Sequence, residues 1–102
     1  MIAVCVTFTI AADKMADFIP LMHRQAAQSL AKEDGCKQFD VCVQGEPSNT
    51  VFLYELYTSR AAFDQHLQSD HFKAFDVEAA PLVTAKKVDI FGQVFTDGQA
   101  GK

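Results

Sequence analysis

Tryptophan is absent from this 102-residue sequence, and proline and glycine are scarce, with three and five residues. The formal net charge is −4 and no basic run occurs, which argues against nucleic acid and anionic membranes as partners. No apolar stretch approaches the ~20 residues of a membrane span. The first residues lack the basic region of a signal peptide, so we expect a cytoplasmic protein.

Cofactor-binding motifs are also missing. The five glycines are isolated from one another, so neither a phosphate-binding loop nor a dinucleotide fingerprint can be formed. The three cysteines, Cys5, Cys36 and Cys42, are an odd number, which argues against a disulfide framework. They fall in strand-like segments without a nearby base, so we expect buried small side chains rather than nucleophiles. The sequence therefore predicts no cofactor.

Apolar residues, by contrast, are abundant. They make up 49% of the chain, and nine of them are phenylalanine. We expect one domain over residues 1–96 and a loose tail over 97–102. A domain of this size buries only somewhat more than ~60% of its unfolded surface. The excess of apolar surface predicts a ligand pocket or a subunit interface.

The first half of the chain reads as strand, helix and strand. Residues 2–10 alternate between large apolar and small side chains, as in a strand. Apolar residues then recur every three or four positions from Met15 to Leu30, which predicts an amphipathic helix. Asp13 is its expected N-cap and Gly35 its expected left-handed C-cap, while Pro20 implies a kink or a late start. Residues 36–44 alternate again.

The second half reads as strand, helix, helix and strand. Residues 50–58 carry the clearest strand pattern and should form a hairpin with residues 36–44. Ser59 is the expected N-cap of a helix, and Ser69-Asp70 separates it from a further helical segment that Pro81 ends. Residues 84–95 predict a long final strand.

This order predicts an α+β fold of the ferredoxin-like βαββαβ type, with an antiparallel sheet and helices on one face. The other face should then be polar, yet strands 50–58 and 84–95 are apolar on both sides. A second copy of the chain is the simplest cover, so we expect a homodimer joined sheet to sheet. We expect Val88, Ile90 or Val94 at its interface.

Four local patterns suggest a family. They are Glu33-Asp34-Gly35-Cys36, Phe39-Asp40-Val41, Tyr54-Glu55-Leu56-Tyr57, and Ala61-Ala62-Phe63-Asp64-Gln65-His66 followed by Ser69-Asp70-His71-Phe72. In order and spacing they resemble the antibiotic biosynthesis monooxygenase family of dimeric α+β barrel proteins. The resemblance implies a pocket between the sheet and the helices. Members of that family include cofactor-free quinol monooxygenases.

The family that the chain resembles also includes an isomerase of a phosphorylated sugar. Its more distant relatives include haem-degrading proteins. As we align them, the isomerase-like branch has a histidine where this chain has Ala26, which weakens the isomerase interpretation. The haem-degrading relatives look to need a tryptophan near the haem, and this chain has none. Haem is therefore not expected.

Two histidines are candidates for proton transfer. His66 borders the inward face of its predicted helix and has an ordinary pKa of ~6.5, near working pH. The alternative is a structural histidine bonded to a backbone carbonyl. His71 opens the next helical segment, where the helix dipole disfavours a positive charge. It is a candidate second acid/base or donor to a ligand oxygen, or else a surface residue.

Tyr54 and Glu55 should point to opposite faces of their strand, so only one can reach the pocket. Tyr54 is a candidate for holding a ligand oxygen beside His66. A carboxylate in an apolar strand needs a partner, and for Glu55 we consider Arg60, His71 or a residue of a second subunit. Glu55, His66 and His71 could in principle form a metal triad, but their spacing fits no ligand motif, so no metal is expected.

Gln25 follows Phe18 by seven residues and leans toward the pocket, whereas His23 should face solvent. Gln25, Glu55, Phe63 and Phe72 are the predicted pocket residues. The predicted activity is a cofactor-free monooxygenase that acts with molecular oxygen on a small hydroquinone or phenolic compound, with His66, Tyr54 and His71 as catalytic residues. The alternatives are an isomerase, a non-catalytic small-molecule-binding protein, or an assembly module whose pocket is filled.

Overall fold

The structure is a computed structural model that describes residues 1–95. Its elements follow the order β1 (Ile2–Ile10), α1 (Met15–Lys32), β2 (Cys36–Val43), β3 (Thr50–Tyr57), α2 (Arg60–Gln68), α3 (Asp70–Ala79), the 3-10 turn η1 (Ala80–Leu82) and β4 (Val83–Phe91). This arrangement confirms the α+β ferredoxin-like fold. The predicted tail, residues 97–102, and the end of the predicted domain at residue 96 lie outside the described residues.

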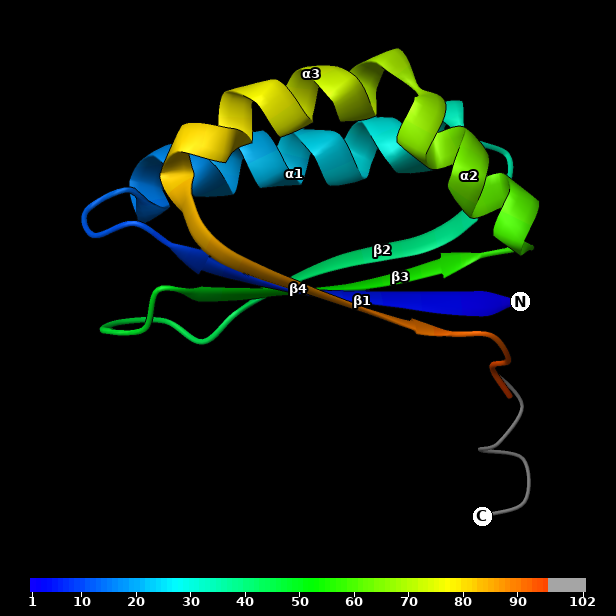
Figure 1. Cartoon of the computed structure of the whole chain (residues 1–102), viewed down its shortest axis with the longest axis horizontal. Helices are drawn as coiled ribbons and strands as arrows, with labels where there is room; N and C mark the ends of the chain where they lie inside the picture. Colours follow the sequence, from blue (N-terminus) through cyan, green and yellow to red (C-terminus); the bar gives the residue numbers. More distant parts are fainter. Residues whose placement is uncertain (96–102) are drawn as a thin grey trace.

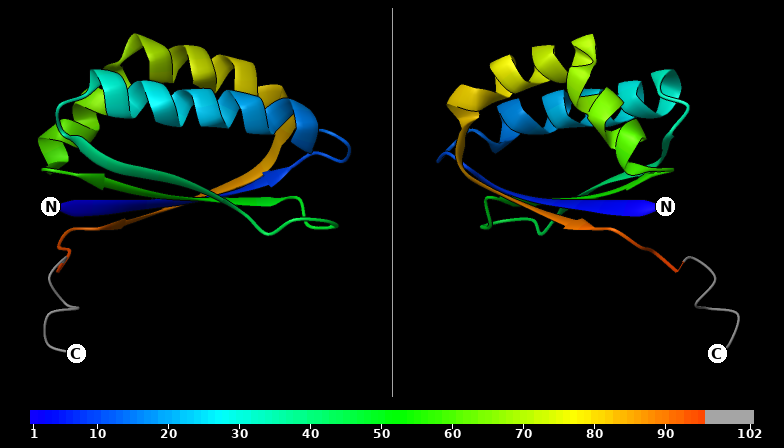
Figure 2. Two further views of the ribbon diagram at one scale, coloured as in Figure 1. Left: turned by 180° about the vertical axis from the view of Figure 1, so that it is seen from behind. Right: turned by 45° about the vertical axis from the view of Figure 1, so that its right-hand side comes forward.

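The four strands form one antiparallel sheet in the order β2-β3-β1-β4. All three α-helices lie on one face of this sheet, and the opposite face carries none of the described elements (Figure 1). The two views in Figure 2 show the same two layers, with β4 at one edge of the sheet. None of the described helices is long and apolar enough to cross a membrane.

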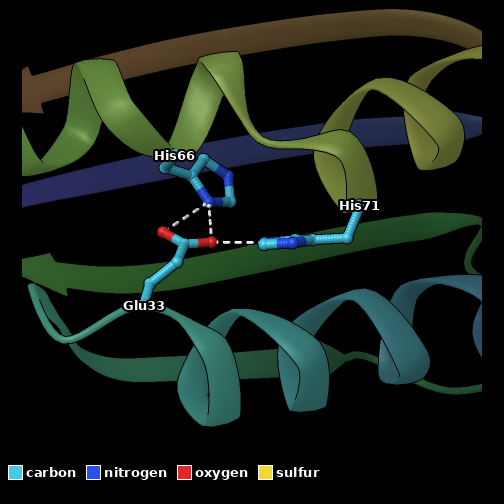
Figure 3. Close-up of side chains that lie close together, drawn as sticks. All are labelled: Glu33, His66 and His71. Atoms are coloured by element: carbon cyan, nitrogen blue, oxygen red, sulfur yellow. Dashed lines mark hydrogen bonds and ion pairs between the residues drawn. The ribbon is translucent and has the colours of Figure 1, made fainter.

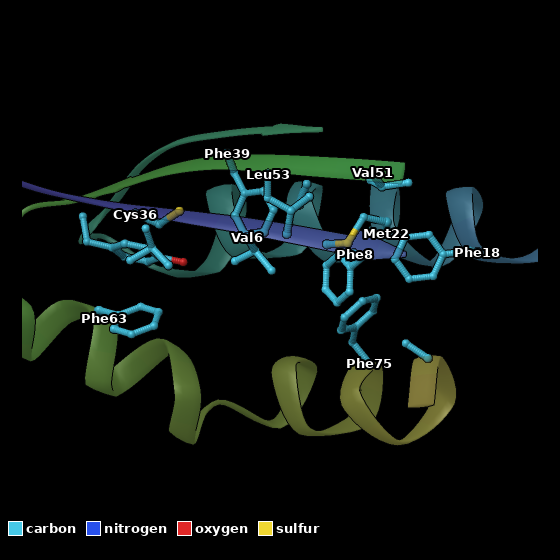
Figure 4. Close-up of a cluster of buried hydrophobic side chains, with 14 of the residues drawn as sticks. Val6, Phe8, Phe18, Met22, Cys36, Phe39, Val51, Leu53, Phe63 and Phe75 are labelled. Atoms are coloured by element: carbon cyan, nitrogen blue, oxygen red, sulfur yellow. The ribbon is translucent and has the colours of Figure 1, made fainter. Parts of the chain in front are cut away.

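The hydrophobic core lies between the sheet and the helices. Alternate residues of β1, from Ile2 to Ile10, are buried on the helix side, as the period-two pattern predicts. Three phenylalanines join strand and helices, since the ring centres of Phe8 and Phe18 are 5.3 Å apart and those of Phe18 and Phe75 are 6.3 Å apart (Figure 4). Edge-to-face contacts of this kind fix the positions of α1 and α3 over the sheet.

The entry into α1 differs from the prediction. Asp13 is not the N-cap; it has a φ of +63°, and Lys14 precedes the helix without a side-chain cap. The chain has to turn sharply between β1 and α1, and aspartate tolerates the left-handed conformation better than most residues. Pro20 lies inside the helix, which runs uninterrupted over Met15–Lys32. The predicted late start is therefore wrong.

Gly35 is not the predicted left-handed cap, because its φ is not positive. A Cβ atom at this position would lie 2.5 Å from Cβ of Ala62 and 3.2 Å from Oγ1 of Thr58. Glycine is needed here because the loop after α1 contacts α2 closely. This contact holds the end of α1 against the start of α2.

The last strand is shorter than predicted. β4 ends at Phe91 rather than at residue 95, because Phe91 pairs with Ala3 and β1 begins only one residue earlier. Beyond that point no strand remains for β4 to pair with. Every residue from Thr84 to Phe91 is exposed, so β4 is a solvent-exposed edge strand in the single chain.

Candidate functional site

A cavity of about 70 Å³ lies between the sheet and the helices. Four of its lining residues are polar or charged: Gln25, Glu55, His66 and Lys86. The remaining lining residues are apolar and are Val4, Val6, Phe8, Met22, Phe39, Leu53, Phe63, Leu67, Phe72, Phe75 and Val88. An apolar cavity with a few polar groups is typical of a small-molecule site.

His66 is enclosed by aromatic rings. It is 3% exposed, and its ring centre lies 5.1 Å from that of Phe72 and 5.4 Å from that of Tyr57. The ring stacks on Phe63 with an interplanar angle of 16°. These contacts fix the ring plane, so that one edge of the imidazole lines the cavity.

A short corner between α2 and α3 positions both histidines. The Ser69 hydroxyl donates to the backbone carbonyl of His66 at 2.6 Å and accepts from the backbone N–H of Phe72 at 3.2 Å. One serine thus ends α2 and caps α3. His66 in the last turn of α2 and His71 in the first turn of α3 face each other across this corner, with ring centres 6.2 Å apart.

Both histidines contact the same carboxylate, that of Glu33 (Figure 3). Nδ1 of His66 lies 2.9 Å from Oε2 of Glu33, and Nε2 of His71 also lies within hydrogen-bonding distance of Oε2. Glu33 is the C-cap of α1 and has an extended backbone, with φ −113° and ψ 110°. The side chains of all three residues are at least 88% buried. This cluster is called the Glu33 triad below.

The Glu33 triad determines the protonation of His66. Burial lowers the pKa of His66, and the hydrogen bond and charge of Glu33 offset part of that shift. A carboxylate at Nδ1 favours the tautomer with its proton on Nδ1, which leaves Nε2 as an acceptor. His66 is thus an oriented base that is neutral near pH 7. His71 is not the surface residue considered above, because its side chain is 8% exposed.

Glu55 also lines the cavity, and its partner within the chain is Tyr57 rather than the Arg60 or His71 that were considered. The hydroxyl of Tyr57 donates to Oε1 of Glu55 at 2.6 Å. Burial raises the pKa of the Glu55 carboxyl to about 7, while the Tyr57 bond and Lys86 oppose the shift. Glu55 can therefore exchange a proton near neutral pH.

The strand alternation separates Tyr54 from this site. Tyr54 pairs with Cys5 and Asp40 on the face of the sheet that carries no helix, and it is not among the cavity residues. The structure therefore does not bring Tyr54 together with His66, and the interpretation in which it faces this cavity is wrong. Phe63, Phe72 and Gln25 line the cavity as expected, and His23 is exposed.

The donor set of the Glu33 triad is one that divalent transition metals accept. The carboxylate is Glu33, however, and not the Glu55 that was considered from the sequence. The ligand atoms lie within 4.8 Å of one another. Ligands of a tetrahedral metal with bonds of ~2.1 Å lie roughly 3.4 Å apart, whereas the His66–Glu33 contacts of 2.9 and 3.1 Å are hydrogen bonds. A bound metal would therefore have to move the contacting atoms of His66 and Glu33 further apart.

The cysteines offer no alternative nucleophile. All three are free. Burial raises the pKa of the Cys36 thiol to about 12 and also raises the pKa of Cys5. Cys42 is exposed, rather than buried as expected, and lies outside the cavity.

Sequence reasoning missed Glu33 and Lys86. Glu33 stands in one of the four quoted patterns, but no local signal places its side chain against histidines more than thirty positions later. The position of Lys86 follows from the pairing of β4 with β1, opposite Phe8. Period-two alternation places Lys86 on the same side of the strand as Val88 and Ile90, so it could have been noted as a residue of the pocket edge.

Comparison with known proteins identifies the family. The sequence model of the family described as "Antibiotic biosynthesis monooxygenase" matches residues 1–77. The protein sll1783 of Synechocystis is 32% identical over 78 residues, which cover 76% of this chain and 52% of that protein. Rv0793 of Mycobacterium tuberculosis, provisionally named a monooxygenase, is 35% identical over 52 residues, 51% of this chain and 50% of that protein. The chain thus matches about half the length of these relatives.

Solved structures have the same fold. A provisionally named antibiotic biosynthesis monooxygenase from Nitrosomonas europaea superposes with a TM-score of 0.86 at 23% identity, covering 93% of this chain and all of that one. A protein of the same description from Caulobacter crescentus gives 0.86 at 26% identity, covering 92% and 90%. The sequence match over residues 1–77, with which the fold agrees, shows that this chain belongs to the antibiotic biosynthesis monooxygenase family.

Proposed function

We propose that this chain is a cofactor-free monooxygenase that acts on a small hydroquinone or phenolic compound. The observation that carries the proposal is His66, a buried imidazole at an apolar cavity with a carboxylate on Nδ1. A base in this setting can take a proton from a phenolic hydroxyl. The surrounding aromatic side chains exclude water and hold a flat ring.

The reaction needs no redox group of the protein. Nε2 of His66 accepts the proton of a ring hydroxyl, and the phenolate is a good one-electron reductant. It passes one electron to molecular oxygen, and the ring radical and superoxide combine to form a carbon–oxygen bond. The peroxide then loses water. One oxygen atom enters the ring product and the other leaves as water, so that a hydroquinone becomes a hydroxyquinone and supplies all four electrons.

The second histidine supports the first. His71 shares Oε2 of Glu33 with His66, so it keeps the carboxylate in place. It is therefore a positioning residue in this proposal. Tyr54 is assigned no part in the chemistry at this cavity, because it lies on the other face of the sheet.

Oxygen uptake by metal-free protein with a panel of hydroquinones and phenols tests the proposal. We expect uptake above the protein-free rate and, with ¹⁸O₂, one labelled atom in the product. His66→Asn should lower the rate about 100-fold or more, the usual contribution of a general base. His23→Asn is the matched control, because His23 is exposed and lies outside the cavity.

Three outcomes would contradict the proposal. They are the absence of uptake with every compound, a His66→Asn variant as active as the wild type, and product formation without oxygen. The last would indicate an isomerase. A thermal shift with ligand but without turnover would indicate a binding protein.

We also propose that the chain works as a homodimer joined through the free face of the sheet. On that face the central strand β1 carries small side chains, including Ala3 and Thr7, while Phe52 on β3 and Phe91 on β4 are 37% and 56% exposed. The two phenylalanines thus lie on either side of β1, whose side chains on this face are smaller. A second sheet related by a twofold axis can approach closely there and cover both aromatic side chains.

The edge strand β4 presents a second apolar surface, on the other side of the sheet. Val88 and Ile90 of β4 pair with Val6 and Val4 and so lie on the helix side of the sheet, where they are 45% and 41% exposed. Exposed apolar side chains on an edge strand favour association with another chain. A partner that covers β4 would bury these side chains beside the cavity that Val88 lines.

A further inference from the structure

Gln25 is a buried amide without a partner. It lies in α1, is 2% exposed and lines the cavity. Neither Oε1 nor Nε2 of its side chain has a hydrogen-bond partner among residues 1–95. A primary amide offers two donors and an acceptor, and burying both ends unpaired destabilises the folded protein.

Several buried polar groups of the core are already paired with other atoms. The Ser29 hydroxyl, one helical turn further on, donates to the backbone carbonyl of Gln25 and not to its side chain. The Tyr57 hydroxyl donates to Glu55, and the Glu33 carboxylate binds both histidines. The amide of Gln25 therefore remains available to a molecule in the cavity.

We propose that Gln25 forms a hydrogen-bonding subsite for a single aromatic ring with oxygen substituents on two adjacent carbons. One hydroxyl of such a ring donates to Oε1 while the neighbouring oxygen accepts from Nε2. Two adjacent ring oxygens lie at about the spacing of a hydrogen bond, like the two ends of an amide, whereas oxygens placed meta or para do not.

The size of the cavity limits its occupant to at most a single ring. A volume of about 70 Å³ is several times the ~10–15 Å³ that one water occupies, but only about half of the roughly 150 Å³ of an apolar cavity that binds benzene. It is smaller than a fused polycyclic compound needs. This inference rests on the proposed function only in taking the cavity as the ligand site. It narrows the proposed class of small hydroquinones and phenolic compounds to those with oxygen substituents on two adjacent ring carbons.

The three dihydroxybenzene isomers test the subsite, because they have the same size and composition. Binding is measured by calorimetry without oxygen, so that turnover plays no part. We expect the 1,2-isomer to bind about tenfold more tightly than the 1,3- and 1,4-isomers. Gln25→Met, which is close in shape, should abolish this preference. Gln65→Met, on the exposed surface of α2, should keep it.

A second measurement separates binding from a structural role. Removing an unpaired buried amide should raise the melting temperature of the free protein in Gln25→Met, whereas loss of a structural hydrogen bond would lower it. Equal affinity for the three isomers, a preference that survives Gln25→Met, or a lowered melting temperature would each overturn the inference.

The outcomes are independent of those for the proposed activity. Isomer preference without oxygen uptake would leave the subsite standing and overturn the monooxygenase proposal. Oxygen uptake without isomer preference would leave the monooxygenase proposal standing and overturn the subsite.

Discussion

Nδ1 of His66 lies 2.9 Å from Oε2 of Glu33, although 33 positions separate the two residues in the sequence. The contact joins the end of α1 to the end of α2, beneath the corner at Ser69. It favours the tautomer with its proton on Nδ1 and leaves Nε2 as the acceptor, so in the proposed mechanism the carboxylate tunes the base without accepting the proton itself. Its removal is the most direct test of how the site works.

Glu33→Gln should weaken the base. The glutamine oxygen can still accept from Nδ1, but the negative charge that raises the pKa of His66 is lost. The pKa of His66 should fall further, so the acidic limb of the activity profile should move to lower pH. The plateau rate should drop roughly tenfold, because a weaker base removes the proton less readily.

Rates of oxygen uptake from pH 5 to 8 check this prediction. Glu78→Gln is the control, since this exposed carboxylate of α3 pairs with Arg24 on the surface. An acidic limb at the same pH in Glu33→Gln and wild type would show that Glu33 does not tune His66.

Metal removal tests the hydrogen-bonded form of the Glu33 triad. Chelator-treated protein should keep its full oxygen uptake, because neither His66 nor Glu33 needs an ion in the proposed mechanism. Added Zn²⁺ should inhibit, since a metal on Nδ1 displaces the proton that fixes the tautomer. Loss of uptake after chelation that is restored by one particular metal would contradict the cofactor-free mechanism.

The raised pKa of Glu55 predicts that its contribution to folding stability falls as pH rises. Its pKa is about 7 in the folded protein, against 4.5 as the ordinary value. The folded state therefore binds the proton more tightly than the unfolded state. The contribution is fully present below pH 4.5 and is lost as pH rises through 7. A shift from 4.5 to about 7 corresponds to at most about 3 kcal/mol.

Urea unfolding of the wild type and of Glu55→Gln at pH 5, 6, 7 and 8 measures this effect. His66 acts in the opposite direction, because burial lowers its pKa, but its effect cancels in the difference between the two proteins. The stability of Glu55→Gln relative to wild type should increase with pH. A difference that stays constant would contradict a neutral, buried Glu55.

The secondary structure was predictable because the apolar period changes sharply along this chain. Residues 2–10 alternate over a full strand, and the helix from Met15 repeats every three or four residues. Ser59 capped its helix as predicted. The prediction of Asp13 as the N-cap was wrong because the preference of aspartate for a cap cannot be distinguished locally from its tolerance of a left-handed turn. The predicted end of β4 was wrong because that end depends on where β1 begins.

The candidate site was only partly predictable. Alternation placed Tyr54 and Glu55 on opposite faces, but only the tertiary structure determines which face carries the helices. His66 was found from its helical position. Its contact with Glu33 depends on how closely α1 and α2 approach each other, which Gly35 permits. No spacing in the sequence encodes that distance.

Gly35→Ala should disturb both stability and site. The new Cβ would lie 2.5 Å from Cβ of Ala62, so α2 would have to move away from the end of α1. Overpacking of this kind costs about 1–3 kcal/mol. Because His66 lies on α2 and Glu33 at the end of α1, oxygen uptake should also fall.

Ala62→Gly provides the matched rescue. Alone, it should cost about 1 kcal/mol as a glycine in a helix. Combined with Gly35→Ala, it removes the atom that is contacted, so the double variant should be more stable than the sum of the two single effects predicts. Strictly additive unfolding free energies would show that this contact does not hold the two helices together.

The dimer is tested by placing a charge on the free face of the sheet. Phe52→Glu adds a carboxylate to a side chain that is 37% exposed in the single chain, so the folded monomer should tolerate it. In a twofold dimer the carboxylate would be buried at the interface, where an unpaired charge is strongly unfavourable. Ile90→Glu applies the same test to the helix side of β4.

Sedimentation at micromolar concentration distinguishes the possibilities. We expect wild-type protein at twice the mass of one chain, Phe52→Glu at the mass of one chain, and the control Val77→Glu unchanged, because Val77 is 75% exposed on α3. If Ile90→Glu also dissociates, the partner covers the helix side of β4 as well as the free face of the sheet. A wild-type monomer, or a Phe52→Glu dimer as tight as wild type, would contradict the sheet-to-sheet arrangement.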